Sequence, residues 1–238
     1  MTWTSSHGPA LEASPLSPQA MPPVLIVDFA AAPLSVPDTV RTALPCGILA
    51  RLRSETRDAH NATEISLGLA SESLSHTGYA RCLARFFGFY HPLEAALHQH
   101  ALRQPFDKLL AGRLDKTGYL TQDLRALGVR SAALALCSAL PPLHTPAEVY
   151  GCLYVVEGAT LGGRVIGPQL QARLGIDAGS GGRFFSGYGE ATGAMWQALR
   201  RALVCAAPDL ATENRIIASA NATFLALRVW CEEEISDE

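Results

Sequence analysis

Apolar residues recur along most of this chain at intervals of three and four, which is the spacing of helices that bury one face. The first such stripe begins after Pro45 and passes through Leu49, Leu52, Thr56, Ala59 and Thr63. The second lies within residues 77–101 and passes through Tyr79, Leu83, Phe86, Phe87, Tyr90, Leu93 and Leu97. The same spacing predicts further helices over residues 117–139, 146–174, 190–206 and 212–234.

Proline and glycine divide these helical segments. Pro141-Pro142, Pro168 and the glycine cluster at 179–182 interrupt the apolar pattern. No segment shows the alternation of a half-buried strand, and no internal repeat is present. The sequence therefore predicts an all-α helical bundle.

Residues 1–45 differ from the rest of the chain. They hold eight of the fifteen prolines, with serine and alanine between them, and their one apolar run, 24–29, is too short to form a core. We expect this Pro/Ala/Ser-rich segment to be a flexible extension. Residues 46–238 are then expected to form one helical domain.

Composition narrows the function classes. Hydrophobic residues make up 48% of the chain, which is enough for a sizeable core, and charged residues only 17%. The net charge is −3, the pI is near 6.2, and no segment gathers lysine and arginine. Binding to nucleic acid or to an anionic membrane surface is therefore not expected.

Cysteine usage and hydropathy favour a cytoplasmic protein. The six cysteines are scattered and include no CxxC pair, so neither a zinc site nor a dense disulfide framework is indicated. No apolar run reaches the roughly 20 residues of a spanning helix. The start of the chain also lacks the basic region and continuous apolar stretch of a signal peptide.

His60 and Glu64 are the first candidate chemical pair. They are four residues apart, so a helix would place both side chains on one face. A neutral histidine that ligates a metal needs an acceptor for its other ring nitrogen, and a carboxylate one turn away can supply it. The alternative is a histidine that only packs or lies at the surface.

The stretch Tyr154-Val155-Val156-Glu157-Gly158-Ala159-Thr160-Leu161-Gly162-Gly163-Arg164-Val165-Ile166-Gly167 is the second informative segment. It has four glycines within ten residues of an otherwise apolar helical pattern. Each glycine costs about 1 kcal/mol relative to alanine in a helix. That cost is offset where the bare backbone approaches a neighbouring helix or a flat ligand. The sequence leaves both explanations open.

Together these segments resemble the haem oxygenase family, in its bacterial, biliverdin-producing branch of the type associated with bacteriophytochromes. LRSETRDAHNATE is similar to the family's L-[KR]-x-x-T-[KR]-x-x-H helix, and YVVEGATLGGRVIG to its kinked distal helix. The resemblance continues through FFGFYHPLEAAL, RFFSGYGEATGAMWQALRRAL and ANATFLALRVW, and covers roughly residues 48–234. It implies a single-domain bundle that holds haem between a proximal and a distal helix.

The resemblance also implies roles for the residues that match. His60 is expected to be the proximal ligand of the haem iron, and Glu64 its partner in the shell around the iron. Arg53 matches a basic residue that pairs with a haem propionate, as a guanidinium does through bidentate bonds. Arg201 matches a second such arginine, although a shift of register would give Arg200.

On the distal side, the resemblance implies that Gly158, Gly162 and Gly163 pass close over the haem and that Tyr90 belongs to the hydrogen-bond network. Tyr90 could equally serve only core packing. The best-known members carry an aspartate after the first glycine, whereas this chain has Ala159. Protons would then reach the site through backbone groups, water, Tyr90 or Thr160.

The implied reaction is the oxidative cleavage of haem b, which is both substrate and cofactor, to biliverdin, carbon monoxide and ferrous iron. It uses O2 and electrons from an external reductant such as a ferredoxin or a flavin reductase. A bilin-binding photoreceptor is a possible downstream partner. The regioisomer, the electron donor and the choice between iron release and chromophore supply stay open.

Two alternatives come from other classes. His91, Glu94 and His98 share one face of a helix and could ligate metal in a di-metal oxidase of similar architecture. The other alternative is a haem-binding carrier or sensor that does not turn its ligand over.

Overall fold

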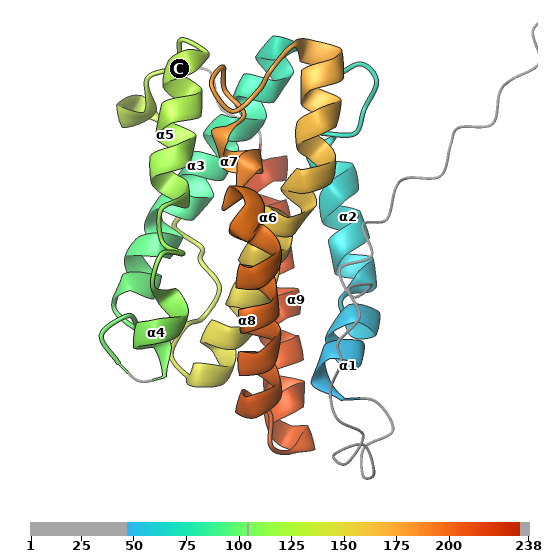
Figure 1. Ribbon diagram of the computed structural model, residues 1–238, viewed down its shortest axis with the longest axis vertical. Coiled ribbons are helices and arrows are strands. Elements are labelled where there is room, and N and C mark those ends of the chain that lie inside the picture. Colours follow the sequence, from blue (N-terminus) through green and yellow to red (C-terminus); the bar gives the residue numbers. More distant parts are fainter. Residues whose placement is uncertain (1–46, 104, 234–238) are drawn as a thin grey trace, which may run out of the picture.

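The computed structural model describes residues 47–103 and 105–233, and within these ranges it contains helices and no strand (Figure 1). The all-α prediction is thus confirmed. The α-helices are α1 Ile48–Glu55, α2 Arg57–Leu67, α3 His76–His98, α4 Phe106–Leu110, α5 Lys116–Ala126, α6 Pro146–Leu174, α7 Arg183–Ser186, α8 Thr192–Ala206 and α9 Leu210–Glu232. The predicted extension, residues 1–45, lies outside the described residues.

Helix α6 occupies the centre of the bundle and packs against α7, α8 and α9. Its start is encoded by a capping box, in which Thr145 accepts from the backbone N–H of Glu148 and the Glu148 carboxylate accepts from that of Thr145. Pro146 follows at the first helical position, and Gly175 ends the helix with a left-handed φ of 67°. The boundaries predicted from the sequence, 146–174, are confirmed.

The close contact between α6 and α9 depends on Gly151. A Cβ at this position would lie 2.6 Å from the Cβ of Ser219 and 2.8 Å from the backbone nitrogen of Ala220. The two helices also share a hydrogen bond, since the Ser219 hydroxyl donates to the carbonyl of Glu148 at 2.7 Å. The absent side chain therefore sets how near the two helices lie.

The first predicted helix is divided in two. At Thr56, between α1 and α2, the backbone has φ −107° and ψ 0°. The Thr56 hydroxyl donates to the carbonyl of Leu52 at 2.6 Å, a bond back along the helix that commonly bends its axis. The N–H of His60 still donates to the carbonyl of Thr56 at 2.9 Å, so the chain bends at this point and continues as a helix.

The predicted helix 117–139 is wrong in its second half, because α5 ends at Ala126. Gly128 has a φ of 77°, and the N–H of Val129 donates back to the carbonyl of Leu124 at 2.8 Å. These are the features of a glycine-terminated helix end. Beyond it, the N–H of Cys137 donates to the carbonyl of Gly88 on α3, so this segment runs along the bundle as a loop. The short helices α4 and α7 were not predicted.

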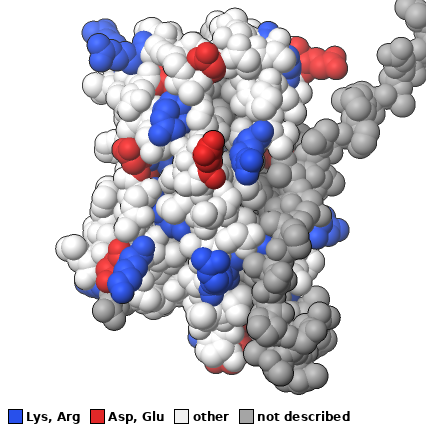
Figure 2. Space-filling model, viewed as in Figure 1, with Lys and Arg blue, Asp and Glu red and all other residues white. Residues whose placement is uncertain are grey.

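Charge on the molecular surface is mixed. On the face shown in Figure 2, lysines and arginines lie among aspartates and glutamates and do not merge into a basic patch. In the described part of the chain, no helix has the length and apolarity needed to cross a membrane. A cytoplasmic location stays a prediction.

We expect Gly151→Ala to destabilise the protein by about 1–3 kcal/mol, because its Cβ would overpack the contact with α9. Gly193→Ala on α8 is the matched control, since the nearest atom to its new Cβ, a nitrogen of Arg164, is 3.9 Å away. Because alanine has a higher helix propensity than glycine, Gly193→Ala should stabilise the protein by up to about 1 kcal/mol. Urea unfolding of both variants measures the difference, and equal effects would contradict close packing at Gly151.

Candidate active site

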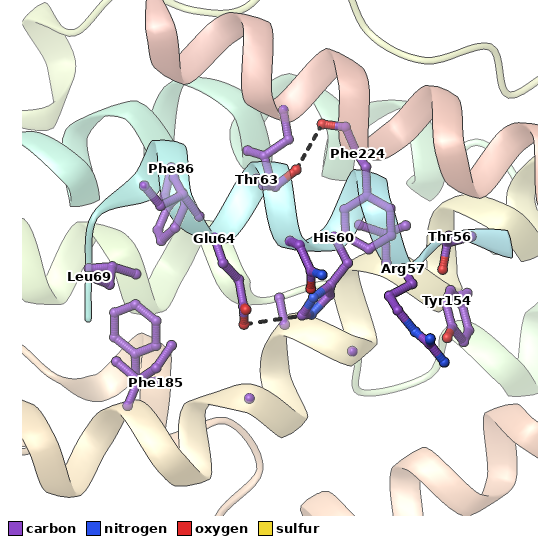
Figure 3. A pocket seen from close by; sticks show the side chains of 18 of the residues that line it. Thr56, Arg57, His60, Thr63, Glu64, Leu69, Phe86, Tyr154, Phe185 and Phe224 are labelled. Atoms are coloured by element: carbon purple, nitrogen blue, oxygen red, sulfur yellow. Dashed lines mark hydrogen bonds and ion pairs between the residues drawn. The ribbon is translucent and has the colours of Figure 1, made fainter. Parts of the chain in front are cut away.

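A cavity of about 270 Å³ lies between α2 and α6. Figure 3 shows α2 on one side and α6 on the other, with side chains from both directed into the space between them. Helices α3, α7, α8 and α9 supply the remaining walls, which are mostly apolar and aromatic. Such a lining suits a flat apolar ligand with a few polar groups at its edge.

His60 stands on the α2 wall, with its ring directed toward α6 (Figure 3). The ring packs edge-on against Phe224 of α9, with ring centroids 5.6 Å apart. Its Nε2 atom lies 3.7 Å from the Oε1 atom of Glu64. Partial burial raises the pKa of Glu64, and the neighbouring His60 opposes this shift. The structure thus brings the predicted pair together on one face of α2.

Polar contacts with α9 hold this wall in place. The Thr63 hydroxyl donates to the carbonyl of Ala59 at 2.8 Å and lies 3.5 Å from that of Phe224. On the preceding helix α1, Arg51 donates to the carboxylate of Glu213 of α9 at 2.7 Å. Because α1 and α2 are both tied to α9, His60 is presented from a supported helix.

The glycines of α6 divide between two roles. Gly158, Ala159 and Gly162 line the cavity, whereas Gly163 does not. A Cβ at Gly163 would lie 2.9 Å from the carbonyl carbon of Phe185, so this glycine lets α7 approach α6. The explanation by helix packing therefore holds at Gly163, whereas Gly158 and Gly162 border open space where a flat ligand could approach.

Helix α7 carries two aromatic side chains into the cavity. Phe184 and Phe185 line it, and the carboxylate of Asp123 on α5 accepts from the backbone N–H groups of Arg183 and Phe184 at 2.8 Å each. That carboxylate caps a helix too short to be stable by itself. The two phenylalanines are thereby fixed against the α6 backbone.

Arg53 lines the cavity at an exposed position, as does Arg57, which the sequence analysis did not single out. Arg57 belongs to the quoted helix motif and follows Arg53 by one turn, so helical spacing could have identified it. Both guanidinium groups lie where the cavity meets solvent.

The two candidate arginines of α8 are placed differently. Arg201 is exposed and does not line the cavity, so the prediction for it finds no support in the geometry. Arg200 is 7% exposed and lies one turn after Trp196, which does line the cavity. Burial lowers the pKa of Arg200, while neighbouring Tyr154, a cavity residue, raises it. Neither arginine lines the cavity, and the proximity of Arg200 to Tyr154, which does line it, makes Arg200 the stronger candidate.

Tyr90 on α3 lines the same cavity and is 2% exposed. Its ring packs edge-on against Phe184, with centroids 5.3 Å apart. Burial raises the pKa of its hydroxyl well above the ordinary value, and so do nearby Cys152 and Glu157. The hydroxyl is therefore a neutral hydrogen-bonding group at physiological pH.

The proposed di-metal cluster on α3 does not form. The carboxylate of Glu94 accepts from the backbone N–H groups of Lys116 at 2.7 Å and Thr117 at 3.0 Å, and so caps α5. Among the described residues, no group of three or more His, Cys, Asp or Glu could hold a metal ion. The interpretation of His91, Glu94 and His98 as ligands is corrected on this ground.

Comparisons with known proteins agree with this geometry. A family model described as "Heme oxygenase" matches residues 47–233. The chain is 19% identical to heme oxygenase from Leptospira interrogans, with a TM-score of 0.66 over 78% of this chain and 98% of that one. No curated protein sequence matches.

Two further solved structures share the fold. A heme oxygenase from Neisseria meningitidis, described as NO- and CO-bound, is 20% identical with a TM-score of 0.62 over 81% of this chain and 95% of that one. Heme oxygenase 2 from Chlamydomonas reinhardtii, described as without heme, is 19% identical with a TM-score of 0.61, covering 78% and 96% respectively. At these identities the likeness establishes the architecture.

We expect Gly162→Leu to affect mainly hemin binding and Gly163→Ala to affect mainly stability. A leucine at Gly162 would occupy the cavity and should weaken hemin binding, followed by Soret absorbance, at least about tenfold, with little loss of stability. An alanine at Gly163 would push α7 away and should lower the free energy of unfolding by about 1–3 kcal/mol. Urea unfolding and hemin titration of both variants test the division, and a Gly163→Ala protein as stable as the unmodified chain would refute it.

Proposed function

Because the chain belongs to the haem oxygenase family, we propose that it binds haem between α2 and α6 and cleaves it to biliverdin, carbon monoxide and ferrous iron. The observation that carries the proposal is His60, an imidazole that faces a helix wall formed by Gly158 and Gly162. Haem b is the substrate. It also supplies the chemistry with O2 and external electrons once it is bound.

The residues around the cavity fit this substrate. Its lining is mainly apolar, as the macrocycle requires, and His60 offers the one kind of nitrogen donor that commonly holds haem iron. Arg53 and Arg57 stand at the exposed mouth, where propionates would emerge. A macrocycle with charged groups along one edge would thus have matching surroundings on every side.

The protein would hold the substrate in position and exclude water from it. Glu64 restrains the His60 ring from one side, and Phe224 packs on it from another. With no side chain at Gly158 or Gly162, the α6 backbone would leave room for the macrocycle and would narrow the space available to O2. Confinement of this kind directs attack to one position of the ring.

Arg53 and Arg200 are the arginines that we assign to the propionates, with Arg57 as a further candidate. Charge-assisted bonds from guanidinium groups would set the in-plane rotation of the macrocycle. That rotation would decide which meso carbon faces the α6 glycines, and therefore which biliverdin isomer would form.

The finer assignment is to the bacteriophytochrome-associated branch, with a bilin-binding photoreceptor as the user of the product. The segment YVVEGATLGGRVIG supports it, because Ala159 stands at a cavity-lining position where the best-known members of the family carry aspartate. A ferredoxin or a flavin reductase would supply the electrons. Residues 46–238 would form the catalytic domain, an assignment that the family match over 47–233 supports.

His60→Ala should abolish the axial-ligand spectrum of the hemin complex and stop biliverdin formation, because no other imidazole lines the cavity among the described residues. Hemin titration and an assay with ascorbate and O2, read at the biliverdin absorbance, measure both effects. His91→Ala, at an exposed position of α3, is the matched control and should behave like the unmodified protein. Hemin binding through His60 without any biliverdin would instead indicate a carrier or sensor.

Arg200→Met should weaken hemin binding about tenfold or more and alter the ratio of biliverdin isomers, since it removes a charge-assisted bond but keeps the aliphatic stem. Arg201→Met, at the adjacent position, is the matched control and should change neither hemin affinity nor the ratio of biliverdin isomers. Hemin titration and chromatography of the products compare the two. If Arg201→Met weakened hemin binding and Arg200→Met did not, the register first predicted from the sequence would be the correct one.

A further inference from the structure

A groove of about 630 Å³ lies where α6 and α9 begin and α8 ends. It shares no lining residue with the cavity between α2 and α6, so it is a separate feature of the molecule. Its polar lining is limited to Thr145, Thr212 and Arg215. The other lining residues are apolar or weakly polar: Pro105, Pro146, Ala147, Tyr150, Cys205 and Ala206.

Large apolar side chains next to the groove residues along the chain are left exposed. Leu102 precedes Pro105 by three residues and is 92% exposed. Val204 and Leu210, which flank the end of α8 and the start of α9, are 54% and 57% exposed. An apolar groove with further exposed apolar side chains nearby is typical of a surface that contacts another polypeptide segment.

The residues that precede α1 join the bundle at this same end. Figure 1 shows the start of α1 at the end of the bundle where α6 and α9 also begin. Arg51, in the first turn of α1, donates to the side chains of Glu213 and Asn214 on α9 at 2.7 Å each. The next residue of α9 is Arg215, which lines the groove. The segment before α1 therefore starts close to the groove.

That preceding segment contains one apolar run, Val24-Leu25-Ile26-Val27-Asp28-Phe29. Residues 30–46, which connect the run to α1, can span up to about 55 Å when extended, so the run can reach the groove. A tether of this length gives the run a local concentration on the order of millimolar, and a weak contact is then enough to hold it. In an extended chain Ile26 and Asp28 point to the same side, which combines an apolar group with a carboxylate.

We propose that residues 24–29 occupy the groove of their own molecule, with Ile26 against its apolar lining and Asp28 paired with Arg215. Arg215 is exposed, and its Nη2 atom donates to the Thr212 hydroxyl at 3.0 Å. A guanidinium has five N–H donors, so it can bind an incoming carboxylate as well. The carboxylate already near Arg215 is that of Asp209, which caps α9 by accepting from the N–H of Thr212 at 2.7 Å. Asp28 would be the second.

Cys205 is a natural probe of the groove. It lines the groove and is the exposed member of the free cysteines in the described part of the chain. Iodoacetamide should alkylate it at least about fivefold faster in full-length Ile26→Asp than in the unmodified protein, because a carboxylate at position 26 cannot enter an apolar lining. Leu16→Asp, outside the apolar run, is the matched control and should keep the rate within about twofold. Peptide mass spectrometry separates Cys205 from the other cysteines.

Amide hydrogen exchange of residues 24–29 tests the same contact without using the thiol. In the unmodified protein these amides should exchange at least about tenfold more slowly than in the isolated peptide. Arg215→Glu should remove this protection, because it sets two carboxylates against each other, and the double variant Asp28→Arg/Arg215→Glu should restore it. Arg125→Glu, at an exposed position of α5 outside the groove, is the matched control and should leave the exchange unchanged.

Equal alkylation rates of Cys205 in the unmodified protein and in Ile26→Asp would show an open groove and overturn the proposal. This comparison decides even if Arg215→Glu fails to fold, because Ile26 lies outside the helical domain. Protection that increases with protein concentration, together with a dimer in analytical ultracentrifugation, would assign the groove to a second copy of the chain and would also overturn it. Neither measurement uses hemin, so the result is independent of the proposed function.

Discussion

The bare backbone of α6 is the constraint on which the rest of this structure depends. Without a Cβ at Gly151 the helix lies against α9, and without one at Gly163 it lies against α7. Between these contacts, Gly158 and Gly162 face the cavity. The same property, the absence of a side chain, thus serves packing on two sides and leaves room for a substrate on a third.

A glycine-rich helix has weak intrinsic propensity, so its neighbours must stabilise it. The capping box at Thr145 and Glu148 strengthens the start of α6. In the middle, Glu157 forms ion pairs with Arg113 and Lys116, which attach the helix to the loop before α5 and to the first residue of α5. The ion pairs of Glu157 lie on the opposite side of α6 from the cavity. They stabilise the position of the helix without obstructing the face that carries Gly158 and Gly162.

The sequence predicted the features that depend on local pattern. The start and end of α6 follow from Thr145, Pro146 and Gly175, whose conformational preferences act within a few residues. The pairing of His60 with Glu64 follows from helical spacing alone. By contrast, Arg200 and Arg201 are both compatible with the motif, and only the packing of α8 decides which is buried. The pairing of Arg113 with Glu157 spans 44 residues, so no local pattern could predict it.

The polar groups around the cavity, and around a second cavity of about 10 Å³ that Tyr90 also lines, belong to different helices. The imidazole and its carboxylate belong to α2 and are supported by α9, while the hydroxyl of Tyr90 and the charges behind it belong to α3, α5 and α6. A carboxylate at position 159 would put an acidic group on the cavity face of α6, whereas Ala159 leaves Tyr154 as the ionisable side chain of that face, and burial raises the pKa of this tyrosine. The α6 wall therefore carries no charged side chain, whereas the basic and acidic side chains of the cavity, Arg53, Arg57 and Glu64, lie on α1 and α2.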